Sequence, residues 1–215
     1  LYMGLTFITK EFQTIEQLRE EFLGMLRVNL RKPEEDGAVT RECEMFPGLE
    51  EYIISVRETP DGGSYMNALV FPVHLEAIGI NTADAWETAV KNTSGAVRID
   101  ELHAVMNELA MDLYGAPVFT PEELENDRIS LYIVTNEIRF AGAGAILYCR
   151  DLLKDVSKDT GTSRWIAYPA SAHDWILEPD IGAGSLEDRV EIMQEVERET
   201  GRSDHLIDKV YYMTV

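Results

Sequence analysis

The residue types of an acyl-transfer site lie close together in one short segment of the chain. Pro169-Ala170-Ser171-Ala172-His173-Asp174 is the densest polar cluster between two apolar runs. A serine activated by a histidine, which a carboxylate orients, is the group set of nucleophilic acyl transfer. Ser171, His173 and Asp174 are therefore the candidate catalytic residues of this sequence.

The spacing of these residues favours a structural turn. Ser171 and His173 lie two positions apart, but neighbours in an extended segment seldom supply a contact from nucleophile to base, and no Gly-x-Ser-x-Gly elbow surrounds Ser171. We expect Ser171 and Asp174 to bond backbone amides and His173 to bridge to a neighbouring strand. Asn136, which ends a predicted strand, is the candidate ligand-binding residue of the same pocket, but a turn role is the favoured interpretation, because an asparagine that ends a strand is more often a turn residue.

Two other patterns bear on cofactors. Ala141-Gly142-Ala143-Gly144-Ala145 has the close glycines of a phosphate-cradling loop but lacks a third glycine and any Gly-Lys-Ser/Thr, so a tight turn with close packing is the better interpretation. No His-Glu-x-x-His motif is present among the four histidines, which are His74, His103, His173 and His205. The sequence therefore predicts no cofactor and no metal site.

The charge balance is the strongest compositional signal. Thirty-nine Asp and Glu stand against nineteen Lys and Arg among 215 residues, for a formal charge of −20 and a pI near 4.5. Such a charge disfavours direct binding to nucleic acid or to an anionic membrane, and a partner recognised by charge should be basic. No apolar run approaches the roughly 18 residues of a membrane span, so we expect a cytoplasmic protein.

Helical spacing of apolar residues predicts helices over residues 14–31, 82–92, 99–113, 151–157 and 186–200. The first has Thr14 as its cap. The third should bury its apolar residues, which are Leu102, Val105, Met106 and Leu109. The last carries a row of acids that should face solvent, namely Glu187, Glu191 and Glu195.

Short β-rich runs predict strands at residues 52–56, 65–71, 129–135, 143–148, 165–168, 175–177 and 210–215. Tight turns join several of them, so the sequence predicts an α+β fold with a mainly antiparallel sheet and helices packed on one face. The polar connection at residues 115–128 is the candidate sub-domain boundary. Cys43 and Cys149, far apart and outside any CxxC motif, are predicted to be buried thiols.

Residues 131–136, which end in Thr135-Asn136, precede the alanine-rich residues 143–148, a helix, and the Pro169 to Asp174 turn between two strands. This succession resembles a bacterial family of uncharacterised proteins, a domain of unknown function, whose turn reads Pro-Ser-Ser-x-His-Glu. Ala170 and Asp174 depart from that pattern. The resemblance covers residues 65–215 and leaves out residues 1–60, which hold a predicted helix and strand. It implies no established activity, only occurrence in bacterial genomes and on mobile elements.

Three hypotheses for the function follow. The leading one is a protein that is not an enzyme and acts through protein–protein contacts, linked to mobile elements. A first alternative is a DNA-mimic inhibitor whose carboxylates imitate phosphates and occupy a nucleic-acid-binding protein. A second alternative is a small hydrolase or ligand-binding domain centred on Ser171, His173, Asp174 and Asn136.

Overall fold

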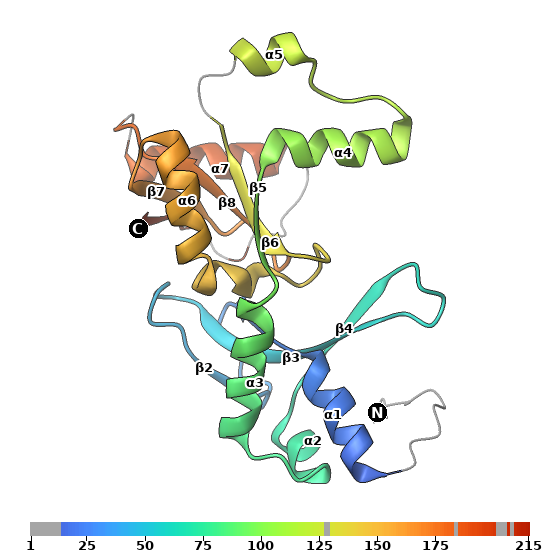
Figure 1. Cartoon of the computed structure of the whole chain (residues 1–215). Coiled ribbons are helices and arrows are strands. Elements are labelled where there is room, and N and C mark those ends of the chain that lie inside the picture. The colour runs from blue at the N-terminus through green and yellow to red at the C-terminus, as the bar shows by residue number, and fades with distance from the viewer. Residues whose placement is uncertain (1–13, 127–129, 183–184, 201–205, 207–208) are drawn as a thin grey trace.

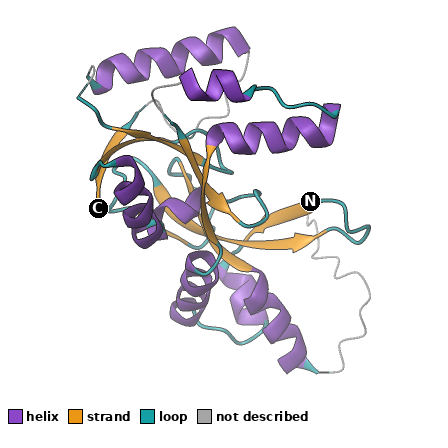
Figure 2. Cartoon of the chain, turned by 45° about the horizontal axis from the view of Figure 1, so that its top comes forward, coloured by secondary structure: helices purple, strands orange, loops and turns teal. Residues whose placement is uncertain are grey.

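The computed structural model describes residues 14–126, 130–182, 185–200, 206 and 209–215. Within them the strands form two sheets, one of four strands and one of five, and every pairing between strands is antiparallel. Figures 1 and 2 show helices packed around both sheets. The predicted α+β class is confirmed.

The four-stranded sheet is built around β3 (Glu50–Glu58). This strand pairs with β1 (Leu26–Arg31) along one edge and with β2 (Thr40–Glu42) and β4 (Tyr65–Leu69) along the other. The predicted strands at 52–56 and 65–71 are therefore confirmed with shifted ends, whereas β2 was not predicted.

The first predicted helix is right only in its first part. Helix α1 (Ile15–Met25) begins at Thr14, whose hydroxyl accepts a hydrogen bond from the Gln17 amide at 3.2 Å, and it ends where β1 begins. Leu26 and Leu30 are spaced for a helix, but together with Val28 they alternate as in a strand, and all three are buried against neighbouring elements. Pairing with β3 therefore overrides the helical pattern after Met25.

Helices α2 (Pro72–Ala77) and α3 (Thr82–Ser94) complete the N-terminal half. Asn81 caps α3 by accepting from the Asp84 amide at 2.8 Å. Ala85 and Ala89 of α3 pack with Phe22 of α1 and Leu26 and Ile53 of the sheet. The small alanine side chains let α3 lie directly on β1.

The five-stranded sheet has the order β5-β6-β8-β7-β9. Its strands are β5 (Val97–Glu101), β6 (Tyr132–Asn136), β7 (Arg164–Tyr168), β8 (Trp175–Pro179) and β9 (Tyr211–Thr214). The predicted strands at 165–168 and 175–177 are confirmed. Those at 129–135 and 210–215 are confirmed with shifted ends.

The predicted helix at 99–113 is wrong at its start and in its burial. Residues up to Glu101 belong to β5, and the helix is α4 (Leu102–Tyr114). Val105 is buried as expected, but Met106 and Leu109 are exposed, because α4 runs past the edge of the sheet (Figure 1). The polar connection that follows contains a further helix, α5 (Pro121–Asn126), which the Thr120 and Glu123 side chains cap reciprocally.

The predicted strand at 143–148 is also wrong. These residues form the 3-10 helix η1 (Ala143–Tyr148), which contacts both β1 and β6 and so lies between the two sheets. The remaining helices are α6 (Arg150–Thr160) and α7 (Leu186–Thr200), both of which the sequence predicts. Glu187, Glu191 and Glu195 on α7 are exposed, as expected.

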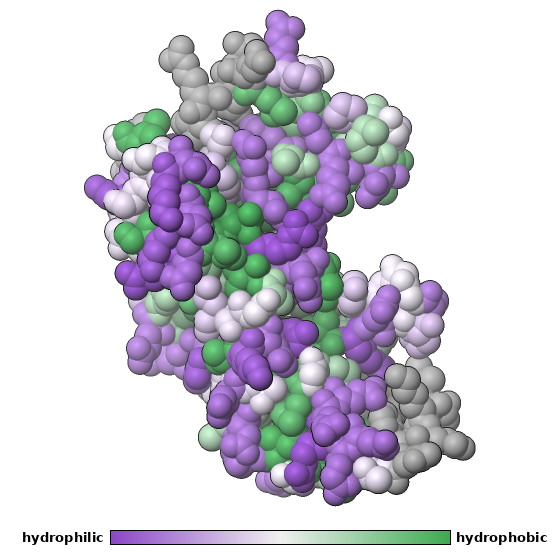
Figure 3. Space-filling view, in the orientation of Figure 1, coloured by the Kyte–Doolittle hydropathy of each residue, from purple (hydrophilic) through white to green (hydrophobic). Residues whose placement is uncertain are grey.

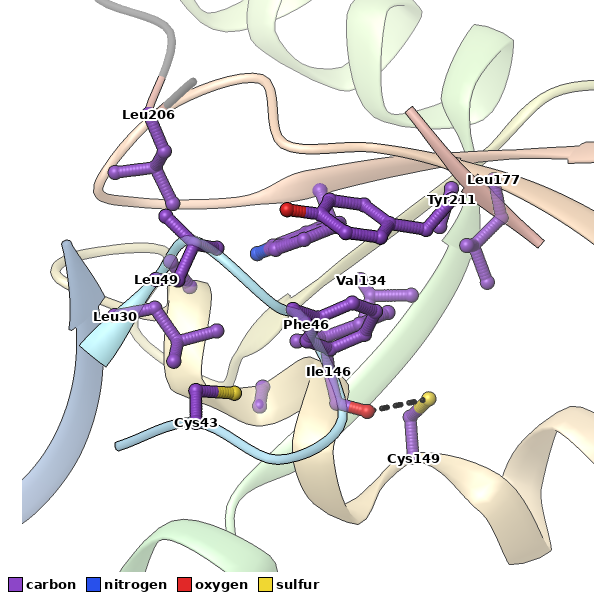
Figure 4. Packing of buried hydrophobic residues seen from close by; sticks show 14 of the residues in the cluster. Leu30, Cys43, Phe46, Leu49, Val134, Ile146, Cys149, Leu177, Leu206 and Tyr211 are labelled. Carbon is purple, nitrogen blue, oxygen red and sulfur yellow. Dashed lines mark hydrogen bonds between the residues drawn. The ribbon is translucent and has the colours of Figure 1, made fainter. Parts of the chain in front are cut away.

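One hydrophobic cluster joins the two sheets (Figure 4). Phe46, from the loop between β2 and β3, lies 4.5 Å from the Trp175 ring and 5.1 Å from the Tyr211 ring, centroid to centroid. Cys43 and Cys149 are unpaired buried thiols within it, which confirms the prediction. Burial raises the pKa of Cys149 to about 12, so its thiolate is not available for chemistry at neutral pH.

No helix in the described ranges is both long enough and apolar enough to cross a bilayer.

Candidate functional site

The loop after β6 is held by the candidate residue Asn136. Its side-chain amide donates to the Phe140 carbonyl at 2.7 Å, and its side-chain oxygen accepts from the Phe140 amide at 3.2 Å. The neighbouring Thr135 hydroxyl donates to the His173 carbonyl at 2.8 Å. The end of β6 is therefore joined both to its own loop and to the turn before β8.

His173 lies against this loop. Its Nδ1 atom accepts a hydrogen bond from the Ala141 amide at 2.8 Å, and its ring packs on Phe140 with 5.2 Å between centroids. Because Nδ1 accepts, the neutral imidazole carries its hydrogen on Nε2. The His173 carbonyl also accepts from the Gly142 amide at 3.1 Å. The histidine thus anchors three successive parts of the loop.

Ser171 and Asp174 are bonded to each other and to the backbone of their own turn. The Ser171 hydroxyl accepts from the His173 amide at 2.9 Å and donates to the Asp174 carboxylate at 3.2 Å. The Ser171 amide donates to the Asp174 carbonyl at 3.1 Å. No hydrogen bond joins the Ser171 hydroxyl to the His173 ring within the described part of the chain. The three residue types are close together, but not in the order that acyl transfer requires.

The loop carries backbone strain beside these residues. Arg139 and Ala141 have φ angles of 50° and 48°, in the left-handed region that costs a non-glycine residue roughly 1–2 kcal/mol. Asn136 holds Phe140 from the side of β6, and His173 holds Ala141 from the side of the 171–174 turn. In addition, Arg139 forms an ion pair of 2.6 Å with Glu108 of α4. The strained loop therefore links β6, the 171–174 turn and α4.

Glycine and asparagine connect this region to the first sheet. A Cβ atom on Gly144 would lie 2.1 Å from the Val28 carbonyl oxygen, so only glycine fits there. The Gly144 amide donates to the buried Asn29 side chain at 3.0 Å, and that side chain donates to the Ala172 carbonyl at 3.1 Å. The glycines of residues 141–145 thus serve close packing, as predicted.

A cavity of about 220 Å³ lies between the first sheet and the end of β6. Its polar lining consists of Arg27, Arg57, Glu58, Tyr65, Asn136 and Glu137. Asn136 is thus the one predicted site residue that lines it, whereas the 171–174 turn does not. The sequence analysis did not single out either arginine. Their type was the available signal, because basic residues are scarce in so acidic a chain.

The other histidines have structural surroundings. His74 accepts from the Phe71 amide at 3.3 Å at the start of α2, and the His103 ring packs on Phe119 with 4.6 Å between centroids. His205 lies outside the described residues. No three His, Cys, Asp or Glu side chains among those the structure describes are grouped to hold a metal ion.

Helix α4 presents an apolar stripe to solvent. Met106, Leu109 and Leu113 lie on one side of the helix at i, i+3 and i+7 and are 38%, 47% and 72% exposed. A different side of α4 is covered by the segment that follows it, where Asn107 bonds both the amide and the carbonyl of Phe119. Figure 3 shows apolar surface at the outer end of α4 and a hollow between this helix and the β3–β4 hairpin. We call these three residues the α4 stripe.

Comparison with known protein families identifies the family of this chain. The model described as a family of unknown function (DUF5688) matches residues 52–214, which is most of the sequence, and the chain therefore belongs to this family. The matched region starts before residue 65, so it includes most of β3 as well as the elements that carried the resemblance. Searches of curated proteins and of solved structures gave no match.

Proposed function

We propose that this protein acts through protein–protein contacts and that α4 docks a basic partner protein. The exposed α4 stripe carries the proposal. Three large apolar side chains in register on an exposed helix are the pattern by which an amphipathic helix anchors in a partner's groove.

The charge around the α4 stripe indicates which charge the partner's binding surface should carry. Residues 101–126 contain six acidic residues and no lysine or arginine. Glu101, Glu108 and Asp112, at the start of α4 and along it, are exposed, and of these Glu108 is paired with Arg139. A partner that covers the stripe must therefore bring an apolar groove bordered by Lys or Arg, because an acidic border would repel the helix.

A pair of matched variants tests this proposal. Leu109 on α4 and Leu152 on α6 are exposed to similar extents, 47% and 43%. The partner captured by the full chain from its native host would be identified, purified and titrated calorimetrically against wild type, L109D and L152D. We expect a basic partner, a loss of affinity of tenfold or more for L109D, and an unchanged affinity for L152D.

Other results would contradict it. An acidic partner, or equal binding by L109D and wild type, would exclude docking on α4. A dimer of this chain that L109D dissociates, measured by analytical ultracentrifugation, would identify a second copy as the occupant instead. Binding that is insensitive to L109D and vanishes at high salt would favour the DNA-mimic alternative, which relies on charge alone.

The hydrolase alternative has less support. The Ser171 hydroxyl is engaged by the His173 amide and the Asp174 carboxylate, and His173 uses Nδ1 to hold Ala141. These contacts favour a structural role for the turn.

A further inference from the structure

The hairpin of β3 and β4 projects from the molecule as a ribbon of two strands (Figure 1). Strand β1 pairs with β3 only as far as Ser55, so among the described strands only β4 pairs with the last residues of β3. On its other side, β4 pairs with no strand in the part of the chain that the structure describes. The outer edge of β4 is therefore a sheet edge to which another strand can be added.

Two hydrogen bonds show which backbone groups of β4 point to this edge. The Thr59 amide donates to the Ser64 carbonyl at 2.8 Å, and the Val70 amide donates to the Ile53 carbonyl at 3.1 Å. The register between these two bonds has no bulge, and successive residues of a strand direct their backbone groups to opposite edges. The even-numbered residues of β4 therefore bond β3. The residues whose amides and carbonyls point to the free edge are Tyr65, Asn67 and Leu69.

The free edge lacks the usual protection against strand pairing, which is a charge, a proline or a bulge. The edge strands β2 and β5 carry charges, among them Arg41 and Asp100. Strand β4 reads Tyr-Met-Asn-Ala-Leu and has no charged residue, no proline and no bulge, although the chain has a net charge of −20. Tyr65 and Met66 are exposed large side chains on opposite faces of the hairpin. The edge is thus uncharged and partly apolar in an acidic molecule.

The side chains of β4 are complementary to a second copy of the same strand. In an antiparallel pair centred on Asn67, a twofold axis places Asn67 opposite its own copy, Tyr65 opposite Leu69, and Met66 opposite Ala68. Each larger side chain then meets a smaller one on the same face, and no charges lie opposite each other. The outward-facing residues all fall in hydrogen-bonded pairs of this register, with two backbone hydrogen bonds in each pair.

We propose that β4 pairs with β4 of a second copy of this chain, in antiparallel register about Asn67. The pairing joins the two four-stranded sheets into one continuous sheet across the dimer. The contact is small, so we expect a reversible dimer with a dissociation constant on the order of 10–100 µM. The acidic surfaces of the two copies repel each other, and added salt should therefore tighten the dimer. This proposal is independent of the α4 stripe.

Sedimentation equilibrium of the full chain tests the proposal, and we expect a monomer–dimer equilibrium. N67P removes the amide on the axis from each copy, and with it two hydrogen bonds of the interface, but no bond to β3. It should weaken dimerisation tenfold or more and keep the circular dichroism spectrum of the wild type. T214D is the control, because Thr214 is an exposed residue of β9, an uncharged edge strand of the other sheet. T214D should leave dimerisation unchanged.

A charge exchange at Asn67 provides a test that damage to the fold cannot imitate. N67D and N67K each place two like charges opposite each other on the axis, so each variant alone should dimerise more weakly than wild type. In an equimolar mixture, opposite charges face each other across the axis. The heterodimer should therefore be tighter than the homodimer of either variant.

A chain that stays monomeric, dimerisation unaffected by N67P, or a mixture that pairs no better than N67D alone would each overturn the proposal. Dissociation of the dimer by T214D would place the contact at β9, and dissociation by L109D would place it at the α4 stripe, so either result would also overturn it. A dimer that weakens with added salt would indicate an interface of ion pairs, which β4 cannot form. None of these failures would affect the docking of a basic partner on α4.

Discussion

His173 supports the fold through its unprotonated ring nitrogen. The Ala141 amide that it binds lies in the strained loop, in which Arg139 and Ala141 have positive φ angles, and replacing the acceptor leaves that amide without its partner. We expect H173F, which keeps a ring against Phe140, to lower the free energy of unfolding by about 1–3 kcal/mol. H173A, which also loses the ring contact, should lower it further. Urea denaturation would measure both, and a fully stable H173F would contradict this role.

Asp36 makes the free energy of unfolding depend on pH in the acid range. Two hydrogen bonds from Arg31, of 2.7 and 2.9 Å, are the main cause that lowers the pKa of Asp36 from 3.8 to about 2. A lowered pKa in the folded state stabilises the protein above pH 3.8, and this contribution is lost as the pH falls towards 2.

We therefore expect D36N to cost about 1 kcal/mol at neutral pH, less than full linkage because the Asp36 side chain is 27% exposed. The difference from wild type should close between pH 4 and pH 2 in urea denaturation. E34Q is the control, since Glu34 is 60% exposed and 3.6 Å from Arg31, and it should change little. A D36N deficit that persists at pH 2 would contradict the assignment.

Helix η1 packs closely against strand β1 at one glycine, Gly144. Alanine at Gly144 would push a methyl group into the Val28 carbonyl, and both backbones are fixed by Asn29. We expect G144A to destabilise the protein by about 3 kcal/mol or more, or to prevent folding.

The matched control is G24A. Nothing lies within 4 Å of a Cβ atom at Gly24, which is inside α1, so alanine there should stabilise the protein by about 0.5–1 kcal/mol. Thermal unfolding of both variants would check the pair. Equal effects of the two substitutions would show that the close approach of η1 to β1 does not limit stability.

The whole molecule carries a net charge of −20, and its acidic side chains repel one another in the compact state. Added salt screens that repulsion, so we expect the midpoint of thermal unfolding at neutral pH to rise by a few degrees between low and about 0.5 M sodium chloride. The same titration near the pI of about 4.5 should have much less effect, because the net charge is then small. A midpoint that falls with salt at neutral pH would indicate that the ion pairs outweigh the repulsion.

Several elements could be predicted because their local signals agree with their tertiary contacts. Thr14 caps α1, the acids of α7 face water, and the apolar runs that form β3, β7 and β8 are bounded by turns. The predicted strand at 143–148 failed because small residues fit a strand and a helical turn alike, and only contact with β1 selects the turn. The predicted burial of Met106 and Leu109 failed because the helix extends beyond the sheet.

Sequence patterns alone predicted the α+β class, the acidic charge, the buried thiols and the resemblance to an uncharacterised family, because composition, spacing and motif are local properties of the chain. The exposure of α4 and the cavity that Arg27 shares with the end of β6 are visible only in the folded chain. Arg27 and Asn136 are more than a hundred positions apart, and they line the same cavity because η1 contacts both β1 and β6. Such meetings depend on packing between distant segments, which no local pattern encodes.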